Sequence, residues 1–133
     1  MPCRGIRGAT TVDENSRDAI VVSTRELLLE MVRLNDVRET DVASAYFTTT
    51  PDLNAEFPAV AARESFGWSY AALMCGHEMS VPGSLPMCLR ILLHVNTDKA
   101  VREIVHVYLR GAQVLRPDRQ NNSEFPRAEA ETR

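Results

Sequence analysis

The chain has 133 residues, 44% of them hydrophobic and 25% charged, which is the length and composition of one ordinary globular domain. Its net charge of −3 argues against nucleic acid as the main partner, because phosphate binding needs a basic face. No apolar run is long enough to span a membrane, so we expect no membrane association.

The cysteine pattern and the first residues indicate the compartment. Cys3, Cys75 and Cys88 form no close pair, so we expect neither a disulfide framework nor a Cys-x-x-Cys metal site. The first residues also lack the apolar core of a signal peptide. We therefore expect a cytoplasmic protein in a reducing environment.

The first predicted elements are a strand and a long helix. Residues 3–12 read as a strand, with Gly5, Arg7 and Ala9 on one face. Residues 16–35 are predicted to form a helix that Asn15 or Ser16 can cap. Its apolar stripe consists of Ile20, Thr24, Leu27, Leu28, Met31 and Leu34. We expect this helix to cover one face of a sheet.

Three more strands are predicted over residues 42–49, 69–75 and 88–96. Between the first two, a short helix is expected to begin at Pro58 and to end at Gly67. The strand over residues 69–75 leads into a loop that runs from Gly76 to Pro86. We expect Gly76 to end the extended conformation of this strand.

The last predicted elements are a helical turn over residues 98–103 and two short strands over 104–109 and 112–115. Residues 1–118 are thus expected to form one domain. Residues 119–133 are polar and are expected to form a mobile tail.

These elements predict an α+β fold with a mixed sheet of five to six strands, one long helix and short helices. The strands are apolar on both faces, yet one helix covers only one face of a sheet. Another copy of the chain is the expected cover for the second face. We therefore predict an obligate oligomer with sites at or near the subunit boundary.

Two arginines on apolar strands are the strongest functional signal. Arg7 lies between glycines, and Arg90 interrupts the apolar stretch 89–95. A buried guanidinium costs free energy unless an anion meets it, and its fork matches a carboxylate. Tyr108 could donate a hydrogen bond to the same anion. A structural ion pair for each arginine and a core position for the tyrosine are the alternatives.

The segment 75–78 offers weaker candidates. Cys75 and His77 would share a face only in an extended strand, and no acid orients His77, so a Cys-His nucleophile pair is disfavoured. Glu78 is a candidate general base or hydrogen-bond acceptor. His94 and His106 match no zinc-ligand spacing.

No glycine-rich phosphate loop occurs either, so no metal and no cofactor are expected. A site made of cations and hydrogen-bond donors, without a nucleophile–base pair, binds an anion, or it catalyses a reaction through electrostatic stabilisation and positioning.

Several segments together resemble the monofunctional AroH-class chorismate mutases, over Arg4 to Asp118. The matching segments are 4–11, 50–53, 57–59, 63–64, 67–68, 78–79, 106–109 and 114–118. The resemblance implies a homotrimeric pseudo-α/β-barrel, an architecture shared with the YjgF-like enamine/imine deaminases, with active sites at subunit interfaces. It also implies the conversion of chorismate to prephenate, a cofactor-free Claisen rearrangement in phenylalanine and tyrosine biosynthesis. Both molecules are dicarboxylates, which suits two arginines.

The resemblance further implies roles for individual residues. Arg90 would face the ether oxygen and a carboxylate, Arg7 and Tyr108 would hold the enolpyruvyl carboxylate, and Glu78 would accept a hydrogen bond from the ring hydroxyl with Cys75 beside it. The segment Met74, Cys75, Gly76, His77 and Glu78 would line the ring. Apolar walls would come from Phe57, Ala59, Leu73 and Leu115, some from the neighbouring chain, with Arg63 and Arg116 adding positive potential.

Two departures from the family pattern stand near this site. Val60 replaces a lysine of the best-known members, and Met74 replaces a smaller polar residue. Two alternatives keep a similar outline: a trimeric module that senses a dicarboxylate without catalysis, and an enamine/imine deaminase. The retained pair of Glu78 and Arg90 favours the mutase.

Overall fold

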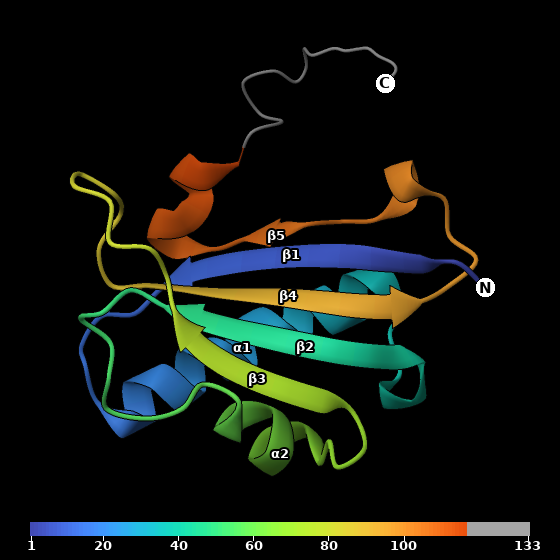
Figure 1. Cartoon of the computed structure of the whole chain (residues 1–133), viewed down its shortest axis with the longest axis horizontal. Coiled ribbons are helices and arrows are strands. Elements are labelled where there is room, and N and C mark those ends of the chain that lie inside the picture. The colour runs from blue at the N-terminus through green and yellow to red at the C-terminus, as the bar shows by residue number, and fades with distance from the viewer. Residues whose placement is uncertain (117–133) are drawn as a thin grey trace.

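A five-stranded mixed sheet with one long helix behind it forms the protein (Figure 1). The computed structural model describes residues 1–116. The strands are β1 (Cys3–Thr11), β2 (Val42–Thr49), β3 (Ala72–His77), β4 (Cys88–Asn96) and β5 (Val107–Tyr108), in the order β3-β2-β4-β1-β5. β4 is antiparallel to both of its neighbours, whereas β3 is parallel to β2 and β5 is parallel to β1. This arrangement confirms the predicted α+β class and mixed sheet.

The helix α1 (Arg17–Asn35) lies across one face of the sheet, as expected. The Ser16 side chain caps its start by accepting a hydrogen bond from the backbone N–H of Ala19 at 3.1 Å. Most of the predicted apolar stripe is fully buried, but Leu34 is 40% exposed, contrary to expectation. Asn35 takes the inward position at this end, because its side-chain amide pairs with the backbone N–H and C=O of Val105.

Gly8 allows α1 to lie close to β1. A Cβ atom at this position would overlap Met31 Sδ and would lie 3.1 Å from Leu27 Cδ1. The absence of a side chain thus sets the distance between helix and strand at this point.

The third strand differs from its predicted bounds at both ends. Its predicted start was wrong, because the backbone N–H groups of residues 69–71 donate to Glu39 Oε2, at 2.7, 2.7 and 3.1 Å, rather than to β2. Glu39 begins the 3₁₀ turn η1 (Glu39–Asp41). The expected break at Gly76 was also wrong, because the pairing with β2 continues through Gly76 to His77.

The C-terminal part is less extended than predicted. β5 has only two residues, and residues 110–115 form the 3₁₀ helix η3 (Arg110–Leu115) instead of a strand. Arg110 has a φ of 49°, which turns the chain, and the Ala112 N–H then bonds locally to Leu109 C=O. A short turn, η2 (Val101–Glu103), confirms the helical turn expected over 98–103. The predicted tail, residues 119–133, lies outside the described residues.

Helices pack against one face of the sheet, whereas much of the opposite face is exposed. α1 and the short helix α2 (Val60–Phe66), which ends at Gly67 as predicted, lie on the side of the main core. The opposite face is open along much of β2, β3 and β4, where Tyr46 is 41% and Met74 63% exposed. At one end, η3 closes over this face, with Ala112 packed in a small cluster with Ala9 and Tyr108. None of the described helices is long and apolar enough to cross a membrane.

Candidate functional site

The strand register brings the predicted anion-binding residues to one part of the open face. Arg90 on β4 is paired with Thr48 on β2 and with Ala9 on β1. Ala9 is in turn paired with Tyr108 on β5. Paired residues point to the same face of a sheet, so these side chains form one row, and Arg7 lies two residues along β1 on the same face.

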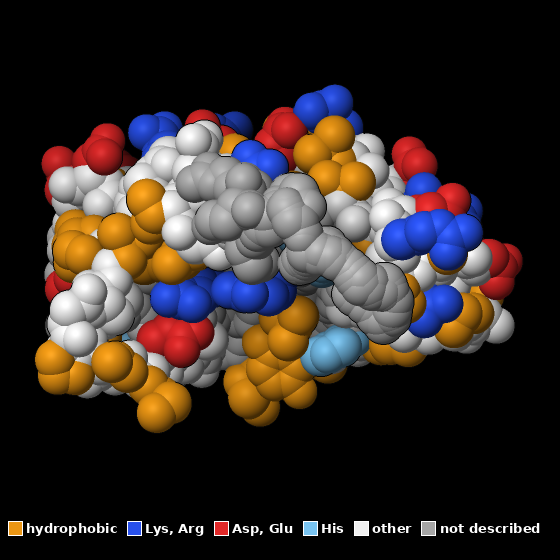
Figure 2. All heavy atoms as spheres, turned by 90° about the horizontal axis from the view of Figure 1, so that it is seen from above, with side chains coloured by type: hydrophobic (Ala, Val, Ile, Leu, Met, Phe, Trp, Pro, Cys, Tyr) orange, Lys and Arg blue, Asp and Glu red, His pale blue; other side chains and the backbone are white. Residues whose placement is uncertain are grey.

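This part of the open face is hollowed into a pocket of about 380 Å³. Its lining consists of Arg7, Tyr46, Thr48, Glu78, Arg90, Ile91 and Leu92. Seen from above in Figure 2, basic side chains gather in a hollow beside an acidic one and next to a group of hydrophobic side chains. The structure thus brings together three of the residues predicted from sequence, Arg7, Glu78 and Arg90.

Glu78 and Arg90 approach each other without forming a tight pair. Glu78 Oε2 accepts a hydrogen bond from Thr48 Oγ1 at 3.0 Å and lies 3.8 Å from Arg90 Nε. Arg90 Nε is buried and has no hydrogen-bond partner among the described residues. A buried guanidinium N–H without a partner is costly, so an acceptor at this position would be favourable.

Arg7 and Tyr108 are adjacent, as predicted. The guanidinium carbon of Arg7 lies 5.7 Å from the centre of the Tyr108 ring, within the range of a cation–π contact. The backbone N–H of Arg7 donates to His106 Nδ1 at 3.0 Å, which connects β1 to the segment before β5. Leu115 packs against the cluster that contains Tyr108, and Arg116 follows directly after η3.

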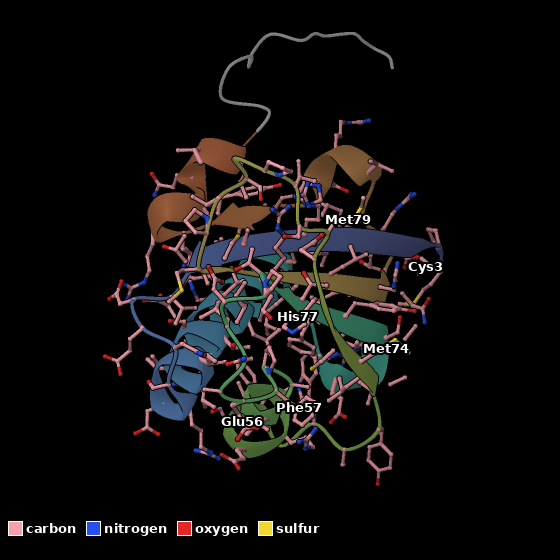
Figure 3. All side chains as sticks on the ribbon, turned by 60° about the vertical axis from the view of Figure 1, so that its left-hand side comes forward. Cys3, Glu56, Phe57, Met74, His77 and Met79 are labelled. Atoms are coloured by element: carbon pink, nitrogen blue, oxygen red, sulfur yellow. The ribbon has the colours of Figure 1, made fainter. Side chains whose placement is uncertain are left out.

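A second pocket of about 340 Å³ lies at the end of β3. It is lined by Thr49, Leu53, residues 54–58, Cys75, Gly76 and His77. Phe57, which is 67% exposed, lies on the loop that leads to α2, and Figure 3 shows it with Glu56 below His77. Met74 belongs to the open face instead, because it is paired with Tyr46.

The surroundings of the Cys75 thiol disfavour its ionised form. Burial raises its pKa, and the nearby Ala59 N–H and the positive charge of Arg63 offset this only in part. Cys75 and His77 do share one side of the extended strand, contrary to expectation. However, His77 Nδ1 lies 3.1 Å from Thr49 Oγ1 and 3.3 Å from Thr49 C=O, so this ring nitrogen faces Thr49.

The predicted site residues therefore fall into two groups on opposite faces of β2 and β3. The arginine group consists of Arg7, Glu78, Arg90, Tyr108 and Leu115. The Phe57 group consists of Phe57, Arg63, Cys75 and His77, with Ala59 buried and Leu73 half-buried against the main core. Met74 and Gly76 are paired with Tyr46 and Thr48, so on β3 they belong to the open face, with the arginine group. Within residues 1–116, no three His, Cys, Asp or Glu side chains converge as a metal site would require.

Sequence reasoning missed Thr48, which orients Glu78, and the apolar neighbours Tyr46 and Leu92. The alternation of side chains along β2 is enough to place Tyr46 and Thr48 on one face. The pairing of Thr48 with Arg90 depends on register, however, and no local pattern carries that information.

Comparison with known proteins defines the class. The chorismate mutase type I family matches residues 3–119. The chain is 44% identical over 118 residues to chorismate mutase AroH of Bacillus subtilis, covering 89% of this chain and 93% of that protein. It is 47% identical over 116 residues to chorismate mutase AroH of Thermus thermophilus, covering 86% and 94%. A solved chorismate mutase from Clostridium thermocellum superposes with a TM-score of 0.81 at 55% identity, covering 83% and 97%.

The fold and the arginine pocket, taken with these relatives, define an isomerase of mixed α+β architecture. The chain belongs to the chorismate mutase type I family. Its activity is accordingly the conversion of chorismate to prephenate, which confirms the activity expected from the resemblance and favours it over the sensor and deaminase alternatives.

Proposed function

We propose that the chain catalyses this rearrangement without a cofactor, as a cytoplasmic homotrimer whose active sites are each shared between two chains. The single observation that carries the proposal is the pocket in which Arg7 and Arg90 face the open side of the sheet beside Glu78. Chorismate is a dicarboxylate, so two guanidinium groups match its charge.

The reaction is a concerted rearrangement within one molecule: the ether C–O bond breaks while a new C–C bond forms. It requires no proton transfer and no covalent intermediate. In this proposal Arg90 meets the ether oxygen as negative charge develops there, and it also meets a carboxylate. Arg7 and Tyr108 hold the enolpyruvyl carboxylate, and Glu78 accepts the ring hydroxyl's hydrogen bond. Catalysis then consists of positioning and of electrostatic stabilisation by preorganised donors.

The geometry of Arg90 supports its proposed role. Its Nε is buried and unpartnered among residues 1–116, and Glu78 lies beyond ordinary hydrogen-bond distance at 3.8 Å. A cation held in place by the sheet, with only a loose ion pair to Glu78, does not have to reorganise when charge develops on the substrate.

The division of the predicted residues into two groups supports the shared site. The arginine group and the Phe57 group lie on opposite faces of β2 and β3, so one chain does not surround a ligand with both. The open face also exposes Tyr46 and Met74, which another copy would cover. In the proposed trimer, the Phe57 group of one chain closes the arginine pocket of the next.

Incubation of the purified chain with chorismate and a chelator tests the cofactor-free reaction. We expect loss of the ultraviolet absorbance of chorismate and formation of prephenate, together with a trimer in sedimentation. Dependence of turnover on an added metal would contradict the proposed mechanism, and a stable active monomer would contradict the shared site.

A mixing experiment tests the shared site directly. Arg90→Ala damages the arginine group and Phe57→Asp damages the other group, so each variant alone should be weakly active. Trimers that contain both variants should regain activity, because some sites combine undamaged groups from two chains. If each site lies within one chain, the mixed trimers stay as inactive as the separate variants.

A further inference from the structure

The loop that carries Phe57 is held from outside by residues at the start of α1. Asn15 Oδ1 accepts hydrogen bonds from the backbone N–H groups of Asn54 and Ala55, both at 3.0 Å. Asn15 Nδ2 also donates to Asn54 Oδ1 at 2.8 Å. One side chain thus fixes two consecutive peptide groups of the loop.

A second contact continues this attachment to the next residues. Arg17 Nε donates to Glu56 Oε2 at 3.0 Å, and Glu56 Oε1 accepts a hydrogen bond from the backbone N–H of Phe57 at 2.8 Å. The other side of the guanidinium lies 3.2 Å from Glu64 Oε2 on α2. Arg17 therefore connects the loop and α2 to the start of α1.

Besides these contacts, the backbone C=O of Phe57 accepts a hydrogen bond from the Val60 N–H at 3.1 Å. The residue is 67% exposed, so packing against the core does not hold it. Residues 54–58 nevertheless form one wall of the pocket whose other side is Cys75–His77. Figure 3 shows Glu56 and Phe57 together on this loop, below His77.

We propose that Asn15 and the Arg17–Glu56 pair are positioning residues that preorganise Phe57 as a wall of the substrate site. This inference rests on the proposed role of Phe57. Exposed polar contacts of this kind add little to global stability. They restrict the loop before substrate arrives, and a loop that must be ordered during binding lowers affinity by that ordering cost.

The kinetic consequence is specific. Without the attachment, residues 54–57 are less ordered before substrate binds, although buried Leu53 still anchors one end, and the bound geometry is then unchanged. The apparent affinity falls while the chemical step keeps its rate, so KM rises and kcat stays nearly constant. We expect KM to rise roughly 3- to 10-fold for Asn15→Ala and for Glu56→Ala, which corresponds to the ordering cost of one or two side chains.

Glu64→Ala is the matched control. It removes the Glu64 partner of Arg17 but leaves every contact to residues 54–57, so KM should equal that of the unmodified chain. Asn15→Asp is the conservative variant, because it keeps an oxygen that accepts from Asn54 and Ala55, and it should restore most of the affinity lost in Asn15→Ala. Thermal unfolding should differ little among the four variants.

A double-mutant cycle with Phe57→Ala distinguishes the possible outcomes. If Glu56 acts through Phe57, Glu56→Ala raises KM in the unmodified chain and has no further effect once Phe57 is alanine. Additive effects of Glu56→Ala and Phe57→Ala on KM would overturn the positioning role alone. The same conclusion would follow if Phe57→Ala raised KM while Asn15→Ala and Glu56→Ala left it unchanged. Unchanged KM in Phe57→Ala would overturn the proposed wall as well.

Discussion

Substitution of Arg90 by alanine separates a catalytic guanidinium from a structural one. The side chain is 27% exposed, and its Nε lies 3.8 Å from Glu78 Oε2. A partly exposed pair at this distance contributes about 0–1 kcal/mol to folding. We therefore expect Arg90→Ala to change the free energy of unfolding by no more than about 1 kcal/mol.

The expected loss of activity is much larger. Removal of one preorganised donor aimed at developing charge costs roughly 3–4 kcal/mol of barrier, a hundred- to thousand-fold in kcat. Arg90→Ala also leaves the Glu78 carboxylate facing a dianionic substrate, which should raise KM. Arg90→Lys should be poor too, because one ammonium does not serve an ether oxygen and a carboxylate together.

Initial rates of chorismate loss, measured with urea denaturation of the same preparations, test these expectations. The double variant Arg90→Ala with Glu78→Gln serves as the charge-matched control. Its KM should be lower than that of Arg90→Ala alone, whereas its kcat should stay as low. Near-normal turnover of Arg90→Ala or Arg90→Lys would refute the catalytic role. A loss of folding free energy above about 3 kcal/mol would indicate a buried structural pair instead.

Three further predictions concern the core, the thiol and the acid limb of stability. Gly8→Ala should destabilise the fold by about 1–3 kcal/mol in urea denaturation, because its Cβ would overlap Met31; unchanged stability would contradict the close approach of α1. Cys75→Ser should keep substantial turnover, because burial raises the thiol's pKa and keeps it protonated; complete loss together with a trapped covalent adduct would favour a nucleophile. Hydrogen bonds from residues 69–71 lower the pKa of Glu39 in the folded state, so its contribution is present at neutral pH and is lost as the pH falls below about 4. Glu39→Gln should therefore reduce the dependence of the melting temperature on pH in the acid range. An unchanged pH dependence would contradict this role of Glu39.

Local patterns were sufficient to predict most elements. The stripe from Ile20 to Met31 determines α1, and the apolar alternation around Arg90 determines both β4 and the fact that Arg90 points away from the core. Patterns were insufficient where a long-range contact competes with propensity. Glu39 takes the N–H groups that would have begun β3 early, and the left-handed backbone at Arg110 replaces a strand with η3.

The sequence by itself determined which side chains carry charge on apolar strands, and hence that an anionic ligand was to be expected. Only the tertiary structure decided which of them meet. Strand register, which no short segment encodes, sets Arg90 opposite Thr48 and so beside Glu78, and it sets Cys75 opposite Phe47 on the other face. The physical reason is that side-chain periodicity is fixed by the backbone within each strand, whereas pairing between strands is chosen by the burial of the whole core.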